Sequence, residues 1–305
     1  MTTWPPAVLG TAQLGFDYGV ANRRGMPDEV DAVAILCCAA ALGVAGFDTA
    51  RAYGESEQRV GLALRKLGQA APPVVTKLAP APESDDAAAL QEHAERSILE
   101  SFEALGCRRI DTLLLHRAAD LGRGDGALWR ALQSHAEDGR IGRLGVSVQS
   151  PAELERALAT PGVAHIQLPF NPLDWRWDEA GAGRRLRERP EVTVDVRSVF
   201  LQGLLFGDER TPWPTVGVEP AALLSALRGL ARELGRRSLA DLCVAHVRAQ
   251  PWVGRLVVGV DGLDQLEETL GLFDRPPLDE AACRALRDLT GRVPEMLLDP
   301  ARWPR

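Results

Sequence analysis

The 305-residue sequence is poor in the features that mark several classes of protein. Its formal net charge of −7 argues against the clustered lysine and arginine of a nucleic-acid-binding surface. No apolar run approaches the roughly 20 residues of a membrane-spanning helix. The opening MTTWPPAVLG has neither the basic start nor the apolar core of a secretion signal. We therefore expect a cytoplasmic protein that binds neither nucleic acid nor a membrane.

Cysteine is scarce, and its spacing does not suggest chemistry. The number of cysteines is odd and no two of them form a CxxC pair, which disfavours a disulfide framework or a metal site. Three of them lie in stretches rich in alanine and leucine that are typical of helices. We therefore predict free, buried thiols in a reducing compartment and no metal site. The five residues are Cys37, Cys38, Cys107, Cys243 and Cys283.

Short β-branched runs alternate with helical stretches along almost the whole chain. Runs such as TLLLH and LVVGV are apolar throughout, which is typical of parallel strands buried on both faces. The predicted strands cover residues 7–10, 46–50, 73–77, 110–116, 143–147, 165–170, 192–198 and 255–260. The predicted helices cover residues 28–42, 55–67, 85–105, 127–137, 151–159 and 178–188, with a pair within 220–249.

Eight alternating units of this kind predict one α/β domain over residues 1–305, a closed (β/α)8 TIM barrel, with an extra helix at 279–289. An open doubly wound sheet is disfavoured because no GxGxxG follows the first strand. Helix boundaries carry their own signals. Ser150 and Glu153 form a predicted capping box. Glycines follow four of the helical stretches, at Gly43, Gly68, Gly106 and Gly139.

Titratable side chains end three successive strands. Asp48 closes the strand GFDTA, Lys77 closes PVVTK, and His116 closes IDTLLLH. Tyr53, one of only two tyrosines, lies in the loop after Asp48. Because a (β/α)8 barrel places its chemistry at the carboxyl ends of the strands, we expect these four side chains to meet at one mouth.

Together, these groups suit the reduction of an aldehyde or ketone. Hydride addition to a carbonyl leaves an alkoxide that needs a proton, and a phenol of ordinary pKa about 10 donates poorly unless its anion is stabilised. Lys77 beside Tyr53 would supply that stabilisation, and Asp48 would keep the buried ammonium charged. His116 would donate a hydrogen bond to the substrate oxygen or pass protons to the phenol.

Each residue alone has a plainer interpretation. Asp48 could cap a turn, Lys77 could be a solvated charge, and His116 could be a satisfied structural histidine. Their joint occurrence at three successive strand ends favours the catalytic interpretation.

With these motifs in place, the chain resembles the aldo-keto reductases over nearly its whole length. LGTAQLGFDYGVAN looks like the family's opening strand and loop, and GFDTARAYGESEQRVGLAL resembles its Asp–Tyr signature. VVTKL and DTLLLH are similar to its lysine and histidine strands. The resemblance implies a (β/α)8 fold and a catalytic tetrad of Asp48, Tyr53, Lys77 and His116.

The resemblance also implies a nicotinamide cofactor, NADP or NAD, that lies across the mouth without a Rossmann fold. Its carboxamide would be held by Ser147 and Gln167, although Val148 stands where the family usually has asparagine. RSVFLQGLL resembles the segment around the ribose and pyrophosphate. Arg197 stands there at the place of an aromatic residue that commonly packs on the nicotinamide ring. The other implied contacts in this segment are Ser198, Leu201 and Gly203.

VVGVDGLDQLEETL resembles the family's adenosine-binding turn and helix. The positions that commonly hold basic residues for the 2′-phosphate of NADP are Asp261 and Gly262 here. An acid repels a phosphate and accepts a hydrogen bond from a free 2′-hydroxyl, so Asp261 favours NAD. Two alternatives remain: Arg255 or another basic residue reaches the 2′-phosphate of NADP, or the turn is an ordinary helix start that binds no cofactor. The implied contacts of this turn are Gly259, Asp261, Gln265 and Glu268.

The substrate is expected to be a small carbonyl compound. The loops NPLDWRW and ERTPWPT offer Trp175, Trp177 and Trp213, with Arg117 and Arg176 nearby, which would suit a polyhydroxylated or anionic molecule. The tryptophans could equally pack the loops onto the barrel. Resemblance to a bacterial branch of the family suggests a sugar-related substrate. The sequence leaves the oligomeric state open.

Two other functions remain at this point. One is a non-catalytic partner protein of the same fold that senses nicotinamide, which the complete tetrad disfavours. The other is an isomerase or aldolase that uses Lys77 as a Schiff base, which Tyr53 and the adenosine-like turn disfavour.

Overall fold

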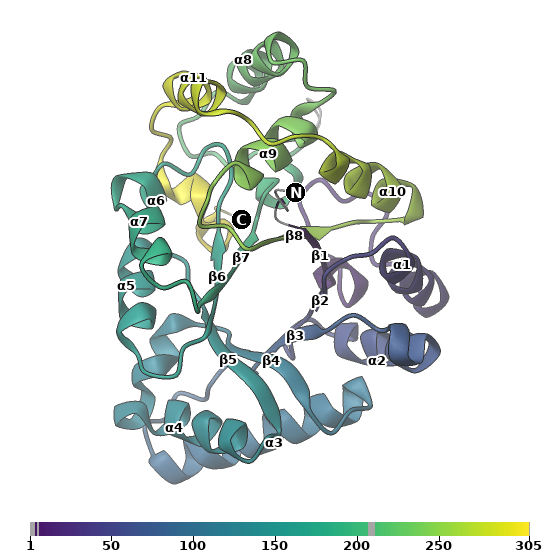
Figure 1. Cartoon of the computed structure of the whole chain (residues 1–305), viewed down its shortest axis with the longest axis vertical. Helices are drawn as coiled ribbons and strands as arrows, with labels where there is room; N and C mark the ends of the chain where they lie inside the picture. The colour runs from purple at the N-terminus through teal and green to yellow at the C-terminus, as the bar shows by residue number, and fades with distance from the viewer. Residues whose placement is uncertain (1–3, 5, 207–210, 305) are drawn as a thin grey trace.

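Eight parallel strands close into a barrel in which each strand pairs with the next along the chain and β8 pairs with β1 (Figure 1). The structure is a computed structural model that describes Trp4, residues 6–206 and residues 211–304. The predicted (β/α)8 barrel is confirmed. The strands are β1 (Ala7–Gly10), β2 (Phe47–Asp48), β3 (Val74–Lys77), β4 (Ile110–Leu115), β5 (Ile141–Ser147), β6 (His165–Pro169), β7 (Thr193–Arg197) and β8 (Arg255–Gly259).

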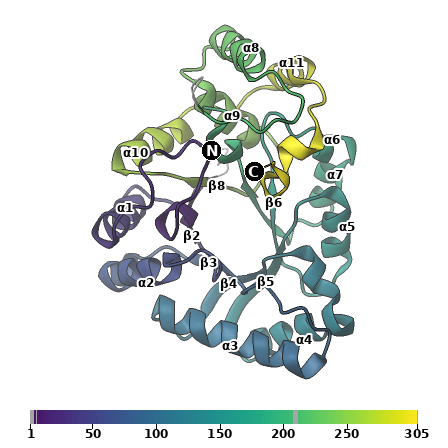
Figure 2. The ribbon, with the colours of Figure 1, turned by 180° about the vertical axis from the view of Figure 1, so that it is seen from behind.

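Helices surround this barrel on all sides, as both views of the ribbon show (Figures 1 and 2). The helix predicted at 279–289 is α11, which packs against α8 outside the ring. The helices are α1 (Glu29–Ala41), α2 (Ser56–Leu67), α3 (Ala87–Leu105), α4 (Arg123–Glu137), α5 (Pro151–Ala159), α6 (Arg176–Glu179), α7 (Ala182–Arg187), α8 (Pro220–Glu233), α9 (Leu239–Arg248), α10 (Leu263–Gly271) and α11 (Glu280–Thr290).

The strands are buried on both faces, which explains their continuous apolar sequence. Every residue of β3 and β6 is buried, because one face fills the barrel interior and the other packs under the helices. β2 is only two residues long, shorter than the predicted 46–50, because Thr49 and Ala50 already belong to the following loop. This short strand places Asp48 directly at the mouth.

Two helical regions differ from the sequence prediction. The stretch 178–188 forms two short helices, α6 and α7, that are separated at Gly181, where φ is +67°. Helix α4 is assigned from Arg123, but Gly124, Asp125 and Gly126 have left-handed backbone angles, so its regular part begins near the predicted residue 127. Local glycine placement accounts for both differences.

The start of α5 has the predicted cap, with one change. The Ser150 hydroxyl accepts from the amide of Glu153 (3.3 Å), as expected. The Glu153 carboxylate accepts from the amide of Gln149 (2.5 Å) and not from that of the N-cap residue. The cap therefore also fixes the backbone of Gln149, which faces the mouth of the barrel.

The five cysteines are free, but only Cys243 is buried, so the prediction of five buried thiols is wrong for the other four. The described helices include none with both the length and the apolar character needed to cross a membrane.

Candidate active site

The four predicted catalytic side chains meet at the carboxyl end of the barrel. The Lys77 ammonium donates to both Asp48 carboxylate oxygens, at 2.8 and 2.9 Å, and to the Thr49 carbonyl at 2.9 Å. It lies 4.9 Å from the centroid of the Tyr53 ring. The rings of Tyr53 and His116 meet edge to face with centroids 5.7 Å apart. The phenol is thus flanked by an ammonium on one side and an imidazole on the other.

Lys77 stays cationic although its side chain is only 1% exposed. Burial alone would lower the pKa of Lys77, but the charge of Asp48 and then the Tyr53 hydroxyl outweigh burial, so this pKa is raised above its ordinary value. The site therefore holds a buried positive charge next to the Tyr53 ring.

Gln167 supports this ion pair from β6. Its amide nitrogen donates to Asp48 Oδ1 at 2.7 Å, so Asp48 is held by both Lys77 and Gln167. The Gln167 side chain is fully buried, and its amide oxygen has no partner among the described residues. A buried acceptor without a donor is costly, and it suits a ligand that carries an N–H group.

The loop that carries Tyr53 is held by two glycines. A Cβ on Gly15 would lie 1.8 Å from the Tyr53 carbonyl, and a Cβ on Gly54 would lie 2.2 Å from the Gly15 carbonyl. Gly54 also has a φ of +54°, and the amide of Glu55 donates to the Gly15 carbonyl at 3.1 Å. The glycine beside Tyr53 therefore lets the loop dock closely on the segment after β1.

A cluster of buried hydroxyls lies beneath this loop. Ser56 Oγ contacts Thr11 Oγ1 at 2.6 Å and Thr49 Oγ1 at 2.9 Å, and donates to the Thr11 carbonyl at 3.0 Å. All three residues are fully buried. These bonds tie the ends of β1 and β2 to the start of α2, so they restrict the backbone on both sides of Tyr53.

His116 is a neutral imidazole at physiological pH. Burial, followed by the charges of Lys77, Arg197 and Arg117, lowers the pKa of His116 to about 3. Its Nδ1 is buried and has no partner within the described part of the chain. A neutral imidazole can donate one N–H in a hydrogen bond to a ligand in this cavity.

A cavity of about 370 Å³ joins these residues to the predicted cofactor segments. It runs from Asp48, Tyr53 and His116 to the turn after β8. Gln167, Leu201 and Glu268 do not line it: the first two are fully buried, and Glu268 is exposed on α10. The predicted cofactor contacts that do line it are Ser147, Arg197, Ser198, Gly203, Gly259, Asp261 and Gln265.

The segment after β7 carries unusual backbone angles. Ser198, Leu201 and Gln202 have φ values of +58°, +48° and +54°, a region that residues other than glycine seldom adopt. Buried Asn171 helps to hold the first of these turns, because its amide donates to the Ser198 carbonyl at 3.3 Å. Such strain is concentrated at functional sites in proteins. Here it directs the backbone of this segment along the cavity.

Arg197 reaches from β7 across the mouth to the loop after β5. Its guanidinium donates to Gln149 Oε1 at 2.7 Å, to the Val148 carbonyl at 3.5 Å and to Ser198 Oγ at 3.3 Å. Val148, at the usual place of asparagine, is buried and offers only its backbone. Gln149 in turn donates to the carbonyl of Leu298 at 3.4 Å, which ties this corner to the C-terminal segment.

The turn after β8 forms the far end of the cavity. Gln265 Oε1 accepts from the amide of Asp261 at 2.6 Å. Arg24 forms a two-bonded pair with the neighbouring Asp264, at 2.8 and 2.7 Å, and both side chains are exposed. Arg255 does not reach this end: it lies at the start of β8 and pairs with Asp195 at 2.7 Å. The basic residue beside the turn is therefore Arg24.

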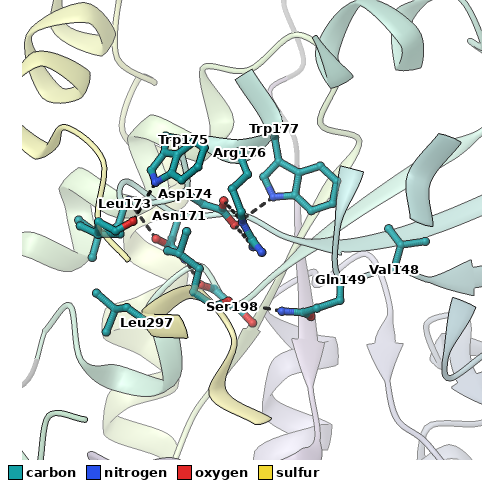
Figure 3. Close-up of polar contacts among 12 residues, drawn as sticks. Val148, Gln149, Asn171, Leu173, Asp174, Trp175, Arg176, Trp177, Ser198 and Leu297 are labelled. Carbon is teal, nitrogen blue, oxygen red and sulfur yellow. Dashed lines mark hydrogen bonds and ion pairs between the residues drawn. The ribbon is translucent and has the colours of Figure 1, made fainter. Parts of the chain in front are cut away.

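Two of the three tryptophans predicted for the pocket are structural. Trp177 is 1% exposed and donates to Asp174, which also pairs with Arg176 at 2.8 and 2.7 Å (Figure 3). Trp175 donates to the Val293 carbonyl at 3.0 Å. These bonds pack the loop onto the barrel, so the packing alternative holds for both tryptophans, and neither they nor Arg176 line the cavity.

Trp213 and Arg117 do not line the cavity either. Trp213 is partly buried against the core, and Arg117 is exposed. Residues 209 and 210 of the stretch ERTPWPT lie outside the described residues.

Sequence reasoning missed several residues of the cavity. Tyr18, the other tyrosine, lines it, and burial followed by the proximity of Tyr53 raises the pKa of Tyr18. Tyr18 lies within the motif LGTAQLGFDYGVAN, so the resemblance of this opening loop to the family could have identified it. The remaining missed residues include Gln13, Gln149, Gln202, Asp299, Pro300 and Ala301.

Comparison with known proteins supports what the fold and site define, an oxidoreductase of the (β/α)8 class. A model of the aldo/keto reductase family matches residues 6–290. The chain belongs to this family, whose members are NAD(P)-dependent oxidoreductases of small carbonyl compounds. It is 27% identical to the aldo-keto reductase str7 of Strobilurus tenacellus, over 97% of this chain and 94% of that protein.

Solved structures of the same fold include two bacterial enzymes. The aldo-keto reductase AKR11C1 of Bacillus halodurans, in its holo form, superposes with a TM-score of 0.76 at 22% identity, over 98% of this chain and 95% of that one. The glycerol dehydrogenase AKR11B4 of Gluconobacter oxydans superposes with a TM-score of 0.72 at 23% identity, over 98% and 96%. At these identities the likeness concerns the fold.

Proposed function

We propose that the protein reduces an aldehyde or ketone, reversibly, with Tyr53 as the general acid and base. A reduced nicotinamide, when bound, supplies the hydride to the carbonyl carbon. Tyr53 gives its phenolic proton to the carbonyl oxygen, and His116 offers its N–H to the same oxygen. In the reverse direction the Tyr53 phenolate takes the proton back from the alcohol.

Lys77 and Asp48 act behind the phenol. The ammonium stabilises the phenolate, and the carboxylate keeps the ammonium charged in a site where it would otherwise lose its proton. A Schiff-base role for Lys77 is disfavoured because a buried, protonated amine that donates three hydrogen bonds is a poor nucleophile.

The cavity suits an extended nicotinamide cofactor. It joins the proton-donating groups to the turn after β8, and the unpaired amide oxygen of Gln167 could accept from a carboxamide by a small shift of its side chain. Ser147 would also hold the carboxamide, and Ser198 and Gly203 would hold the middle of the molecule. We propose NAD as the preferred form, because Asp261 faces the cavity and the nearby Arg24 is already paired with Asp264.

A single observation carries this proposal: one cavity contains Asp48, Tyr53 and His116 together with the turn at Asp261. The test is to titrate the protein with NADH and NADPH and then follow oxidation of each with a panel of aldoses and small aldehydes. Reduction of an aldehyde with tighter binding of NADH supports the proposal. Cofactor binding with no turnover across the panel contradicts it and favours a sensing role. The sugar-like substrate and the cytoplasmic location remain predictions.

A further inference from the structure

The mouth of the barrel holds a guanidinium, that of Arg197, which forms no ion pair with any of the described carboxylates, although Asp48, Asp261 and Asp299 line the same cavity. The acceptors of Arg197 are an amide oxygen, a backbone carbonyl and a hydroxyl, all of them neutral. By contrast, Lys77 at the same mouth is paired with Asp48, and Arg176 behind it is paired with Asp174. A guanidinium has five N–H donors in a planar fork, so Arg197 retains donors for a further partner.

The position of this guanidinium is fixed by a chain of contacts. Gln149 accepts from it at 2.7 Å, and the Gln149 backbone is itself held by the Glu153 carboxylate at the start of α5. The Gln149 side chain also donates to the Leu298 carbonyl. Neutral partners of this kind orient a cation and leave its charge available, which is the arrangement that suits an anionic ligand.

The charge of Arg197 acts on the reacting groups. It contributes to the lowered pKa of His116, and it also acts to lower the pKa of Tyr18, so both rings lie within its electrostatic reach. Arg197, Tyr53 and His116 line the same cavity. An anion bound to Arg197 would therefore lie close to the carbonyl that Tyr53 protonates.

We propose that Arg197 binds the anionic group of the substrate, and that the substrate is an aldehyde or ketone carrying a carboxylate or phosphate near its carbonyl. This inference rests on the proposed function and narrows its substrate class. A bound anion would also offset the repulsion between this guanidinium and an oxidised, cationic nicotinamide. The proposal assigns Arg197 to the substrate, in place of the ring-packing role implied by its position.

Two matched aldehydes test the proposal by activity. Glyoxylate and glycolaldehyde have the same carbon skeleton, but only glyoxylate is an anion. We expect kcat/KM to be at least tenfold higher for glyoxylate than for glycolaldehyde. Arg197→Gln should lower kcat/KM for glyoxylate roughly 10- to 100-fold, because a charge-assisted hydrogen bond is lost, and the change should appear mainly in KM. Reduction of glycolaldehyde should fall by a smaller factor, so that the ratio of kcat/KM for glyoxylate over glycolaldehyde decreases severalfold. The same comparison of kcat/KM for glyceraldehyde 3-phosphate and glyceraldehyde shows whether the site prefers a phosphate or a carboxylate.

Three further variants separate anchoring from general charge effects. Arg197→Lys keeps the charge but loses the fork, and should retain part of the preference for glyoxylate. Gln149→Leu releases the guanidinium and should raise the KM for glyoxylate by a smaller factor. Arg117→Gln removes an exposed charge that also acts on His116, and should leave the ratio of the two aldehydes unchanged.

A binding measurement decides the proposal without turnover. Oxamate is an unreactive anion of the size of glyoxylate, and oxamide is its neutral counterpart. Calorimetry on the protein saturated with reduced cofactor should show oxamate binding that Arg197→Gln weakens at least tenfold, with affinity for the cofactor nearly unchanged. Equal affinities for oxamate and oxamide would overturn the proposal. It would also be overturned if Arg197→Gln lowered kcat/KM equally for both aldehydes, or weakened cofactor binding as much as oxamate binding. If no aldehyde is reduced but oxamate binding depends on Arg197, the proposed reaction fails and this site stands.

Discussion

The buried pair of Lys77 and Asp48 allows stability and catalysis to be separated in one experiment. The Lys77 side chain is 1% exposed and the Asp48 side chain is 5% exposed. Lys77→Met leaves the Asp48 carboxylate buried, with the Gln167 amide as its remaining side-chain donor among the described residues. Removing one partner of a buried ion pair typically costs about 3–5 kcal/mol, a large part of the roughly 5–15 kcal/mol that stabilises a domain.

The double variant Lys77→Met/Asp48→Asn should recover at least half of that loss, because it removes the unpaired charge and keeps the shape of the Asp48 side chain. Neither variant should reduce an aldehyde at a useful rate, since neither has an ammonium beside Tyr53.

Urea unfolding at neutral pH, followed by circular dichroism, measures these differences in stability, and the slope of the unfolding free energy against urea checks for two-state behaviour. A cost below about 1 kcal/mol for Lys77→Met would refute the reasoning, because the pair would then be effectively solvated. A double variant less stable than the single one would refute it as well.

Three other predictions concern the turn, the loop and acid stability. Asp261→Arg should raise the ratio of kcat/KM for NADPH over NADH about tenfold or more, and an unchanged ratio would mean that this turn does not contact the 2′ position. Gly54→Ala should lower the free energy of unfolding by roughly 1–3 kcal/mol and should also lower kcat, because its Cβ meets the Gly15 carbonyl. Gly25→Ala is the control: Gly25 has a φ of +73° but open space around it, so kcat should be unchanged. Burial, and then the charge of Arg287, lowers the pKa of His246 from 6.5 to about 4. The free energy of unfolding should therefore fall by up to about 3 kcal/mol as the pH drops from 6.5 towards 4. His246→Asn should reduce that fall, measured by urea unfolding at pH 6.5 and pH 4.

The barrel and the positions of the four predicted catalytic side chains could be predicted because both depend on local sequence pattern. Apolar runs of four to seven residues identify buried parallel strands, and the residues that end those runs must share one edge of the barrel. Asp48, Lys77 and His116 follow from this rule alone. Gly54 marks the tight turn beside Tyr53, although the close approach to Gly15 needed the structure.

The other features of the site depend on contacts between distant segments, which leave no local signal. The bond between Arg197 and Gln149 spans the ends of β7 and β5, and the C-terminal segment reaches the cavity only because of how it folds back. Trp175 and Trp177 have the same local pattern whether they face a ligand or pack a loop. Their hydrogen bonds to Val293 and Asp174 decide between the two.

The central claim is that the phenol beside Lys77 delivers the proton. Tyr53→Phe removes that hydroxyl, and Tyr18→Phe removes the other tyrosine hydroxyl of the same cavity. Steady-state reduction of an aldehyde, with cofactor affinity measured by fluorescence titration, compares them. We expect kcat to fall roughly 10²- to 10⁴-fold in the first variant and less than about tenfold in the second, with cofactor affinity nearly unchanged in both. A Tyr53→Phe variant that keeps its kcat within tenfold of the original protein would contradict the account.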